Sequence, residues 1–337
     1  MKKLLLIGEC SNNPAVYTYV TSFSHSFEEL GFEVELFNNK KNYFPLWLPK
    51  QFLLNSYIMN FLLKRKIKKN KPDVIFILKG ENIFASTLAL AKQCGSILYN
   101  FFPDNPFVVW NGNSSVELLK SLPLYDIFFI WSKQLMPIIK MAGATFVRYL
   151  PFGYDSRLFY KSIALSALEK AKYQSQVCFV GSWDEDRQQW LEELLQAKPD
   201  LDLAIWGDRW KDHVLQDSCL YRCLRSEAIY GERLLKVFAG SKIILNFLRA
   251  QNATSHNMRT MEVCATGAFL LTEWSHEQAR ELFIENEEVA CFKTIPELVE
   301  KIAYYSTHDL ERQKIAERGY QKVQQYTITK LLAEWLK

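Results

Sequence analysis

The sequence lacks long apolar runs, repeats and low-complexity segments. No apolar run approaches the roughly 18 residues that a membrane-spanning helix needs. The N-terminal run Leu4–Ile7 is too short for a signal peptide and ends at Gly8, so it predicts a first β-strand instead. These absences leave the pattern of a globular protein with a substantial core, at 49% hydrophobic and 23% charged residues.

The cysteines do not form the pattern of a disulfide framework or a metal centre. They are seven in number and scattered, which is typical of reduced thiols in a cytoplasmic protein. Cys219 and Cys223 have no second pair and only His213 nearby, too few ligands for a zinc site. We therefore expect a cytoplasmic location, no metal and no bound cofactor.

Acidic residues are missing between Leu36 and Pro72, although nine basic residues lie there. The net charge of the chain is +4, so the remainder carries −5. Seven aromatic residues fall between Phe37 and Phe61 in the same segment. Residues 40–71 would suit an interfacial helix on the inner, anionic face of a membrane. They would equally suit a helix that packs on a sheet and ends in a basic turn. Nothing resembles a nucleic-acid module.

Short apolar runs alternate with longer amphipathic segments along the chain, which predicts two parallel sheets covered by helices. The predicted strands are 3–8, 34–38, 73–79, 96–102, 126–132 and 145–151 in the first half, and 177–182, 201–207, 242–248, 268–272 and 289–294 in the second. The predicted helices are 14–30, 51–70, 83–94, 184–196, 231–240, 257–266, 295–306, 309–325 and 328–336.

A polar segment at 160–175 interrupts this alternation and predicts the domain junction. We expect an α/β protein with two Rossmann-like doubly wound domains and a central cleft: residues 1–160, residues 175–310, and closing helices over 311–337. Ligands of such sheets bind outside the carboxyl ends of the strands. In the second domain these ends carry Gly181-Ser182, Gly207-Asp208, Arg249 and Glu273.

The stretch SHNMRTMEVCATG, residues 255–267, predicts a helix that opens at this edge. Ser255 or Asn257 would cap it, and Gly267 would end it. The free N–H groups at its start favour an anion. Arg259 would add a bidentate phosphate clamp, and Glu262, one turn deeper, would accept hydrogen bonds from a sugar diol. By spacing alone, an i, i+3 surface ion pair explains the two residues as well.

The stretch HNMRTMEVCATGAFLLTE resembles the signature of the CgeB-like spore-maturation glycosyltransferases, relatives of family 4 with the GT-B fold. The likeness continues in VCFVGSWDEDRQQWLEEL, GSKIILNFLR and LPFGYDSRLF, and spans roughly residues 96–325. It implies a donor that is a nucleotide-diphosphate sugar, with UDP as one candidate nucleotide. By the same resemblance residues 175–310 would bind this donor and residues 1–160 the acceptor. By this resemblance the nucleotide-sugar-binding residues are Gly181, Ser182, Arg187, Ser255, His256, Asn257, Met258, Arg259 and Glu262. Arg249 joins them because it directly follows a buried strand and so reaches the cleft edge.

The resemblance gives Glu262 the role of ribose ligand and places Ser255, His256 and Arg259 near the diphosphate. Family 4 enzymes carry a second glutamate eight residues before the ribose ligand, and here that position is Thr254. In retaining enzymes that glutamate contacts the donor sugar. The family therefore implies a retaining transferase, but this substitution leaves both the sugar and the stereochemical course open.

Two residues are the candidates for catalysis. Asp104, in the turn PDNP after the fourth strand, would act as general base on an acceptor hydroxyl, unless it is only a turn residue. His256 is the one histidine in a motif and would contact phosphate or sugar. The segments expected at the cleft show no Asp-x-Asp stretch suited to a metal clamp, so helix N–H groups and arginines would stabilise the leaving diphosphate.

The sequence thus predicts a metal-independent glycosyltransferase. Its partners would be a nucleotide sugar and a glycan, lipid-linked or protein acceptor in cell-surface or polysaccharide biosynthesis. Two alternatives share the fold. A nucleotide-sugar epimerase would need no acceptor, and a non-catalytic GT-B relative would only bind a glycan or a partner.

Overall fold

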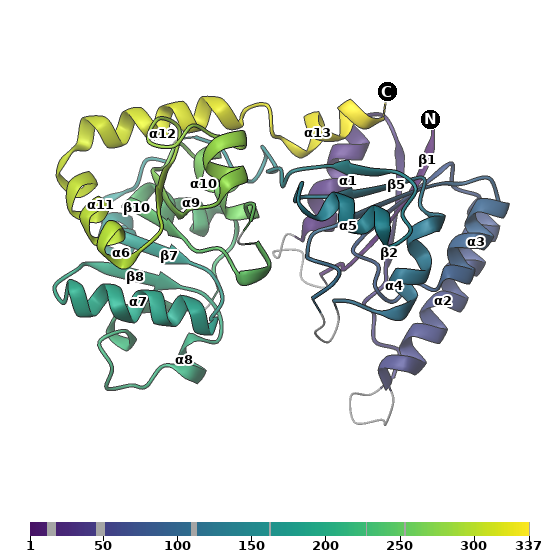
Figure 1. Ribbon diagram of the computed structural model, residues 1–337, viewed down its shortest axis with the longest axis horizontal. Coiled ribbons are helices and arrows are strands. Elements are labelled where there is room, and N and C mark those ends of the chain that lie inside the picture. Colours follow the sequence, from purple (N-terminus) through teal and green to yellow (C-terminus); the bar gives the residue numbers. More distant parts are fainter. Residues whose placement is uncertain are drawn as a thin grey trace. The chain divides into compact units, whose positions relative to one another are not determined.

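The computed structural model describes all residues except 12–17, 45–50, 109–112, 162, 227, 253 and 337. It divides into two compact units (Figure 1). The first comprises Met1–Phe152 together with Ile328–Lys337, and the second comprises Gly153–Thr327.

The first unit is built on a parallel sheet of order β2-β1-β3-β4-β5-β6. Its strands are the short apolar runs of the first half of the sequence, and every residue of β3 is buried, as expected for a sheet covered on both faces. The strands are β1 Lys3–Gly8, β2 Glu33–Asn38, β3 Val74–Leu78, β4 Ile97–Phe102, β5 Ile127–Ile130 and β6 Val147–Tyr149.

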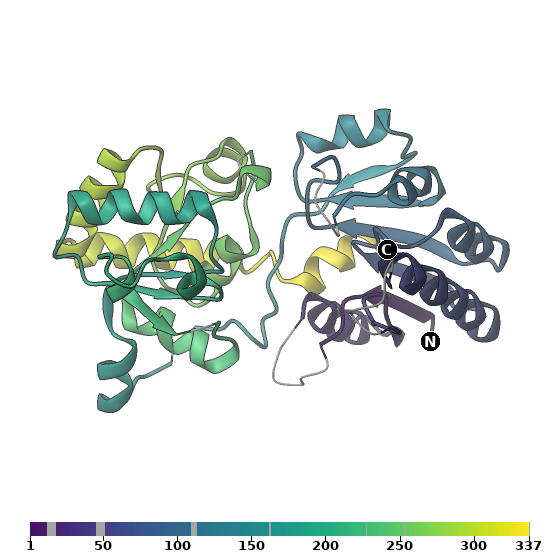
Figure 2. The same ribbon diagram turned by 90° about the horizontal axis from the view of Figure 1, so that it is seen from below.

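Helices cover both faces of this sheet. The last helix of the chain, α13, returns to pack on α1 (Figure 2), and Thr329 donates a hydrogen bond of 2.7 Å to Glu29 there. The long helix α2 packs on α3. The helices are α1 Tyr19–Glu29, α2 Gln51–Asn70, α3 Ala85–Gln93, α4 Val116–Ser121, α5 Leu135–Met141 and α13 Ile328–Trp335. Among the described residues, no helix combines the length and apolar character needed to cross a membrane.

The second unit repeats this plan with a parallel sheet of order β12-β11-β10-β7-β8-β9. One face of the sheet packs on α7 and α11, and these elements share one apolar core around Phe179, Leu245 and Phe292. The strands are β7 Ser175–Val180, β8 Leu203–Trp206, β9 Leu224–Ser226, β10 Ser241–Asn246, β11 Leu270–Glu273 and β12 Ala290–Phe292. The helices are α6 Ala167–Tyr173, α7 Glu185–Ala197, α8 Trp210–His213, α9 Gly231–Gly240, α10 Met258–Ala265, α11 Ile295–Thr307 and α12 Asp309–Val323.

The predicted strands are all present, and the predicted helices 51–70 and 231–240 have the predicted limits. The sequence analysis missed the edge strand β9, the short helices α4, α5, α6 and α8, and a π-helix over Glu277–Leu282. The start of the predicted helix 14–30 falls within residues outside the described part of the chain.

The units divide at Phe152, before the polar segment expected to be the junction. That segment contains α6, which begins with a reciprocal capping box between Ser166 and Glu169. Lys236 of α9 lies 2.8 Å from Glu169, so α6 is anchored to the second unit. The predicted closing helices are likewise split, because α12 belongs to the second unit and α13 to the first.

Candidate functional site

The carboxyl edge of the second sheet begins with a close contact between β7 and β8. A Cβ atom on Gly207 would lie 1.9 Å from the carbonyl oxygen of Gly181, so only glycine fits there. The indole N–H of Trp210 donates a hydrogen bond of 2.8 Å to the same oxygen. The turn from Gly181 to Ser182 is therefore held in place by the close backbone contact with Gly207 and by the hydrogen bond from Trp210.

Helix α10 opens at this edge, as predicted. Asn257 is its N-cap and accepts a hydrogen bond of 3.3 Å from the backbone N–H of Thr260. The Asn257 amide also donates to Asn246 Oδ1, at the end of β10, over 3.0 Å. Gly267, with φ of +73°, follows the end of the helix. The remaining N–H groups of the first turn thus point to the sheet edge where ligands of such folds bind.

Arg259 and Glu262 form an ion pair on α10. Arg259 Nη1 donates to Glu262 Oε2 over 2.8 Å, and the two side chains are only 21% and 16% exposed. The Arg259 guanidinium lies 5.4 Å from the centre of the Phe238 ring of α9. Burial raises the pKa of Glu262, and the charge of Arg259 opposes that shift. The alternative of a surface ion pair is therefore replaced by a half-buried pair on α10, with Arg259 packed against Phe238 of α9.

Arg187, on the first turn of α7, is a partly buried cation near the end of β7. Its Nη1 donates to the Ser182 carbonyl over 3.0 Å, and its guanidinium lies 5.5 Å from the Phe179 ring. Its Nε–H is buried and has no hydrogen-bond partner among the described residues. Burial, followed by the charge of Arg249, lowers the pKa of Arg187 to about 10. A buried donor without a partner is costly, and an anionic ligand would satisfy it.

Three arginines at this edge, Arg187, Arg249 and Arg259, interact electrostatically. Both Arg249 and Arg259 repel the charged form of Arg187, so the three guanidinium groups lie near enough to act on one another. Arg249 Nε lies 3.5 Å from Asp184 Oδ2, the one carboxylate that pairs with it among the described residues. Like charges held together in a folded protein favour an anion between them.

Ser255 and His256 directly precede the N-cap of α10, and both side chains are fully buried. Ser255 Oγ is 2.8 Å from His256 Nδ1, and Ser275 donates to the Ser255 carbonyl. Asn252 donates to the His256 carbonyl over 3.4 Å. These contacts let His256 support the loop before α10. Contact of His256 with phosphate or sugar stays a prediction.

Burial of His256 predicts a pH-dependent stability. Burial lowers its pKa from the ordinary 6.5 to about 3, against the opposing carboxylate of Glu277, 3.9 Å from Nδ1. Between these values the unfolded chain binds a proton that the folded chain does not, so stability falls as pH drops from about 6.5 toward 3, by at most about 1.4 kcal/mol per pH unit. We expect His256→Gln to flatten the pH dependence of the urea midpoint.

The matched control is His276→Gln, since His276 is 66% exposed beside Glu281. This variant should keep the pH slope of the parent. Equal slopes for the parent and His256→Gln would show that the imidazole is protonated inside the fold.

The residues next to the N-cap face solvent. Thr254 is exposed, and Met258 is 40% exposed whereas Met261 is fully buried. Met258 therefore lies apart from the buried face of α10 that holds Met261. Both positions lie beside the helix N-terminus, where a bound ligand would meet them.

A network of buried polar side chains beneath this edge was not predicted from the sequence. Thr260 donates to Gln278 Oε1 over 2.6 Å, and Asn246 donates to Thr272 over 3.1 Å. Glu273 accepts from the backbone N–H of Leu248 over 2.8 Å, and burial raises the pKa of Glu273. Polar residues inside apolar runs, such as Asn246 in KIILNFL, were the available signal.

Carboxylates line one small cavity at the same edge. It has a volume of about 360 Å³ and is lined by Asp186, Gln189, Trp190, Glu193, Leu248, Ala250, Glu273 and Ile295. Asp184 and Asp186 form an Asp-x-Asp spacing at this edge, where none was predicted from the sequence. Asp184, however, sits opposite Arg249, and no group of three potential metal ligands occurs within the described residues.

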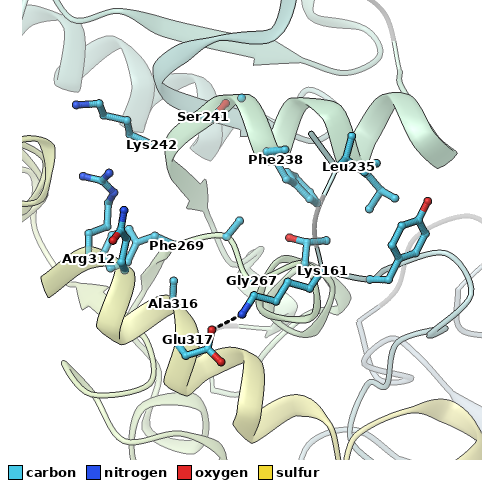
Figure 3. Close-up of a pocket in the computed structure, with 17 residues that line it drawn as sticks. Lys161, Leu235, Phe238, Ser241, Lys242, Gly267, Phe269, Arg312, Ala316 and Glu317 are labelled. Carbon is cyan, nitrogen blue, oxygen red and sulfur yellow. Dashed lines mark hydrogen bonds and ion pairs between the residues drawn. The ribbon is translucent and has the colours of Figure 1, made fainter. Parts of the chain in front are cut away.

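A larger cavity of about 450 Å³ lies at the opposite edge of the sheet (Figure 3). It is bounded by the end of α9, the loop Thr266–Phe269 and α12, and the ion pair between Lys161 and Glu317 crosses its wall. Because β10 and β11 begin here, this is the amino edge of the sheet, away from the expected ligand site. Phe238 lines this cavity and also lies beneath Arg259, so it separates the cavity from the candidate site.

In the first unit, Asp104 lies beyond the end of β4 and pairs with Lys79 at the end of β3. Lys79 Nζ is 2.7 Å from Asp104 Oδ2, and the side chains are 23% and 21% exposed. Lys79 has a left-handed backbone, φ +68°, and Asn100 donates to its carbonyl over 3.0 Å. Asp104 is thus a positioned carboxylate at the carboxyl edge of its sheet.

Comparison with known proteins agrees with this geometry. A family model described as glycosyl transferase-like matches residues 187–337. The spore protein CgeB of Bacillus subtilis (strain 168) is 24% identical over 284 residues, which are 80% of this chain and 83% of CgeB.

Two solved structures share the fold over nearly all of both chains. Sucrose-phosphate synthase from Thermosynechococcus elongatus superposes with a TM-score of 0.72 at 14% identity, over 100% of this chain and 98% of the synthase. Anabaena Alr3699/HepE, in complex with UDP and glucose, gives a TM-score of 0.62 at 13% identity, over 98% of each chain.

The class predicted from the sequence is therefore confirmed: the chain is an α/β protein of GT-B type with a glycosyltransferase-like second half. The similarity to CgeB over 80% of the chain agrees with the predicted resemblance to CgeB-like proteins.

Proposed function

We propose that this protein transfers a sugar from a nucleotide-diphosphate sugar to an acceptor hydroxyl. The observation that carries the proposal is the Nε–H of Arg187, which is buried and has no hydrogen-bond partner in the described part of the chain. It lies in the field of two further arginines, Arg249 and Arg259, at the carboxyl edge of the second sheet. A diphosphate has the charge and the acceptor oxygens that such a site lacks.

The roles of the second unit follow from its geometry and the family likeness. The N–H groups of α10 and the three arginines stabilise the negative charge that grows on the leaving diphosphate, and no metal ion is required. Glu262 leaves its ion pair with Arg259 to accept hydrogen bonds from the ribose diol. Gly181, Ser182 and Met258 contact the donor through backbone and apolar surface.

The donor and its stereochemistry rest on the likeness to other proteins. UDP is the first nucleotide to test, since HepE was solved with UDP and glucose. The likeness to family 4 favours retention of configuration, with Thr254 at the position of the missing sugar-binding glutamate. The acceptor, held by the first unit, is a glycan, a lipid-linked sugar or a protein at the cytoplasmic face of a membrane, in cell-surface or polysaccharide biosynthesis.

The deciding experiment measures nucleotide binding and product formation with the full chain. A thermal-shift screen of UDP, GDP, TDP and CMP identifies the base, because a ligand that binds only the folded state raises the apparent stability. The matching nucleotide sugar is then incubated with and without a mixture of glycan acceptors. We expect release of nucleoside diphosphate that depends on acceptor.

Two outcomes would replace this proposal. A new sugar isomer formed from the donor alone would identify an epimerase. Binding of glycans without any release of nucleoside diphosphate would identify a non-catalytic relative. The anomeric configuration of a transferred sugar, read by NMR, decides between retention and inversion.

A further inference from the structure

Helix α2 lies on the outside of the first unit (Figure 1). It carries an exposed apolar stripe. Leu53, Tyr57 and Phe61 follow one another at intervals of four residues and are 54%, 59% and 58% exposed. Residues four apart lie on one side of a helix. Large apolar side chains grouped in this way on a surface mark a binding face rather than a core.

The opposite side of α2 accounts for its packing on the sheet. Met59, Leu63 and Ile67 are no more than 1% exposed. Lys66 pairs with Glu35 of β2 on that inner side. The interpretation of residues 40–71 as a helix that packs on the sheet is thus confirmed for α2, but it leaves the outer stripe unexplained.

Cations continue the outer stripe toward the helix C-terminus. Arg65 and Lys68 are exposed, and neither forms an ion pair within the described residues. At about 100° per residue, Lys68 falls inside the arc of about 80° that holds Leu53, Tyr57 and Phe61, and Arg65 lies about 40° beyond it. The Arg65 guanidinium also lies 5.8 Å from the Phe61 ring, which joins the apolar and basic halves of the stripe.

We propose that this face of α2 binds the surface of an anionic lipid bilayer. Aromatic and aliphatic side chains enter the boundary between headgroups and acyl chains, and cations pair with lipid phosphates. The positive charge around α2 favours an anionic bilayer as the partner, because the segment Leu36–Pro72 contains nine basic residues and no acidic one. The binding needs no donor or acceptor sugar, so it holds whether or not the chain transfers sugars.

The lipid-binding face contains fewer residues than the segment 40–71 that the sequence suggested. Lys40 pairs with Glu81 and is directed inward, and its pKa is lowered by burial. Trp47 and Lys50 lie outside the described residues. The lipid-binding residues are therefore those of the outer face of α2: Leu53, Leu54, Tyr57, Phe61, Lys64, Arg65 and Lys68.

The test is flotation of the full chain with vesicles of phosphatidylcholine, with and without phosphatidylglycerol. We expect binding only to the anionic vesicles, and its loss as salt rises from about 0.1 M to 1 M and the screening length falls from about 10 to 3 Å. Tyr57→Ser/Phe61→Ser and Arg65→Gln/Lys68→Gln should each weaken partitioning at least fivefold.

The matched control is Met141→Ser/Phe146→Ser, which removes two exposed apolar residues, 81% and 56% exposed, from another surface of the same unit. This variant should bind vesicles like the parent. An equal loss in the control, salt-independent binding, or no binding would overturn the proposal. So would a dimer in solution that Tyr57→Ser/Phe61→Ser dissociates, or binding of DNA in place of vesicles.

Discussion

Replacing Glu262 by alanine is expected to weaken binding of the matching nucleoside diphosphate at least tenfold, about 1.4 kcal/mol. The variant loses the carboxylate that would hold the ribose diol and leaves Arg259 half-buried without its ion-pair partner. Arg259→Ala should have a similar effect, because it removes one cation from the three-arginine edge. Titration calorimetry with UDP, or with the base found by thermal shift, measures both.

A second pair of variants separates a ligand role from a merely structural one. Arg259→Glu/Glu262→Arg keeps opposite charges at i, i+3 and so preserves a helix ion pair. It should remain as weak a binder as the single variants. The control Asp309→Ala removes the i, i+3 pair with Arg312, 2.6 Å long, on α12 of the same unit and should bind nucleotide normally. Recovery of affinity in the swapped variant would reduce Arg259 and Glu262 to a structural ion pair.

The environment of this pair shows where sequence reasoning stops. Spacing places Arg259 and Glu262 on one helix face, which the structure confirms, but spacing does not reveal how deeply that face is buried. The burial depends on Phe238, which comes from α9, more than 20 residues earlier. Propensity and periodicity describe one element at a time, whereas the environment of a side chain depends on its neighbours in space.

His256 illustrates the same limit. The polar letters Ser-His-Asn suggest a solvated loop, yet Ser255 and His256 are buried because Ser275 and Asn252 satisfy their backbone carbonyls. Long elements were easier to predict. The apolar runs that form most strands of the two sheets are longer than those found in turns, so they can be recognised in the sequence. Strand β9 has only three residues at a sheet edge and gives almost no periodic signal.

Asp104→Asn is expected to reduce kcat by about 100-fold, within the range that general-base catalysis contributes. The amide keeps the shape of the turn but takes no proton from the acceptor hydroxyl. Nucleotide affinity should not change, because the arginines and Glu262 belong to the other unit. Steady-state kinetics with saturating donor and acceptor measure the effect, with calorimetry on the nucleotide as the second readout.

The control for Asp104 is Asp126→Asn. Asp126 also pairs with a lysine, Lys92, over 2.9 Å, but it immediately precedes β5 and so lies at the amino edge of the same sheet. Loss of a half-exposed Asp–Lys pair is common to both variants, so its cost to stability cancels in the comparison. If Asp104→Asn keeps the kcat of the parent, Asp104 is a turn residue whose charge serves only to pair with Lys79. Because retaining transfer can proceed without an enzymic base, the same result would favour retention of configuration.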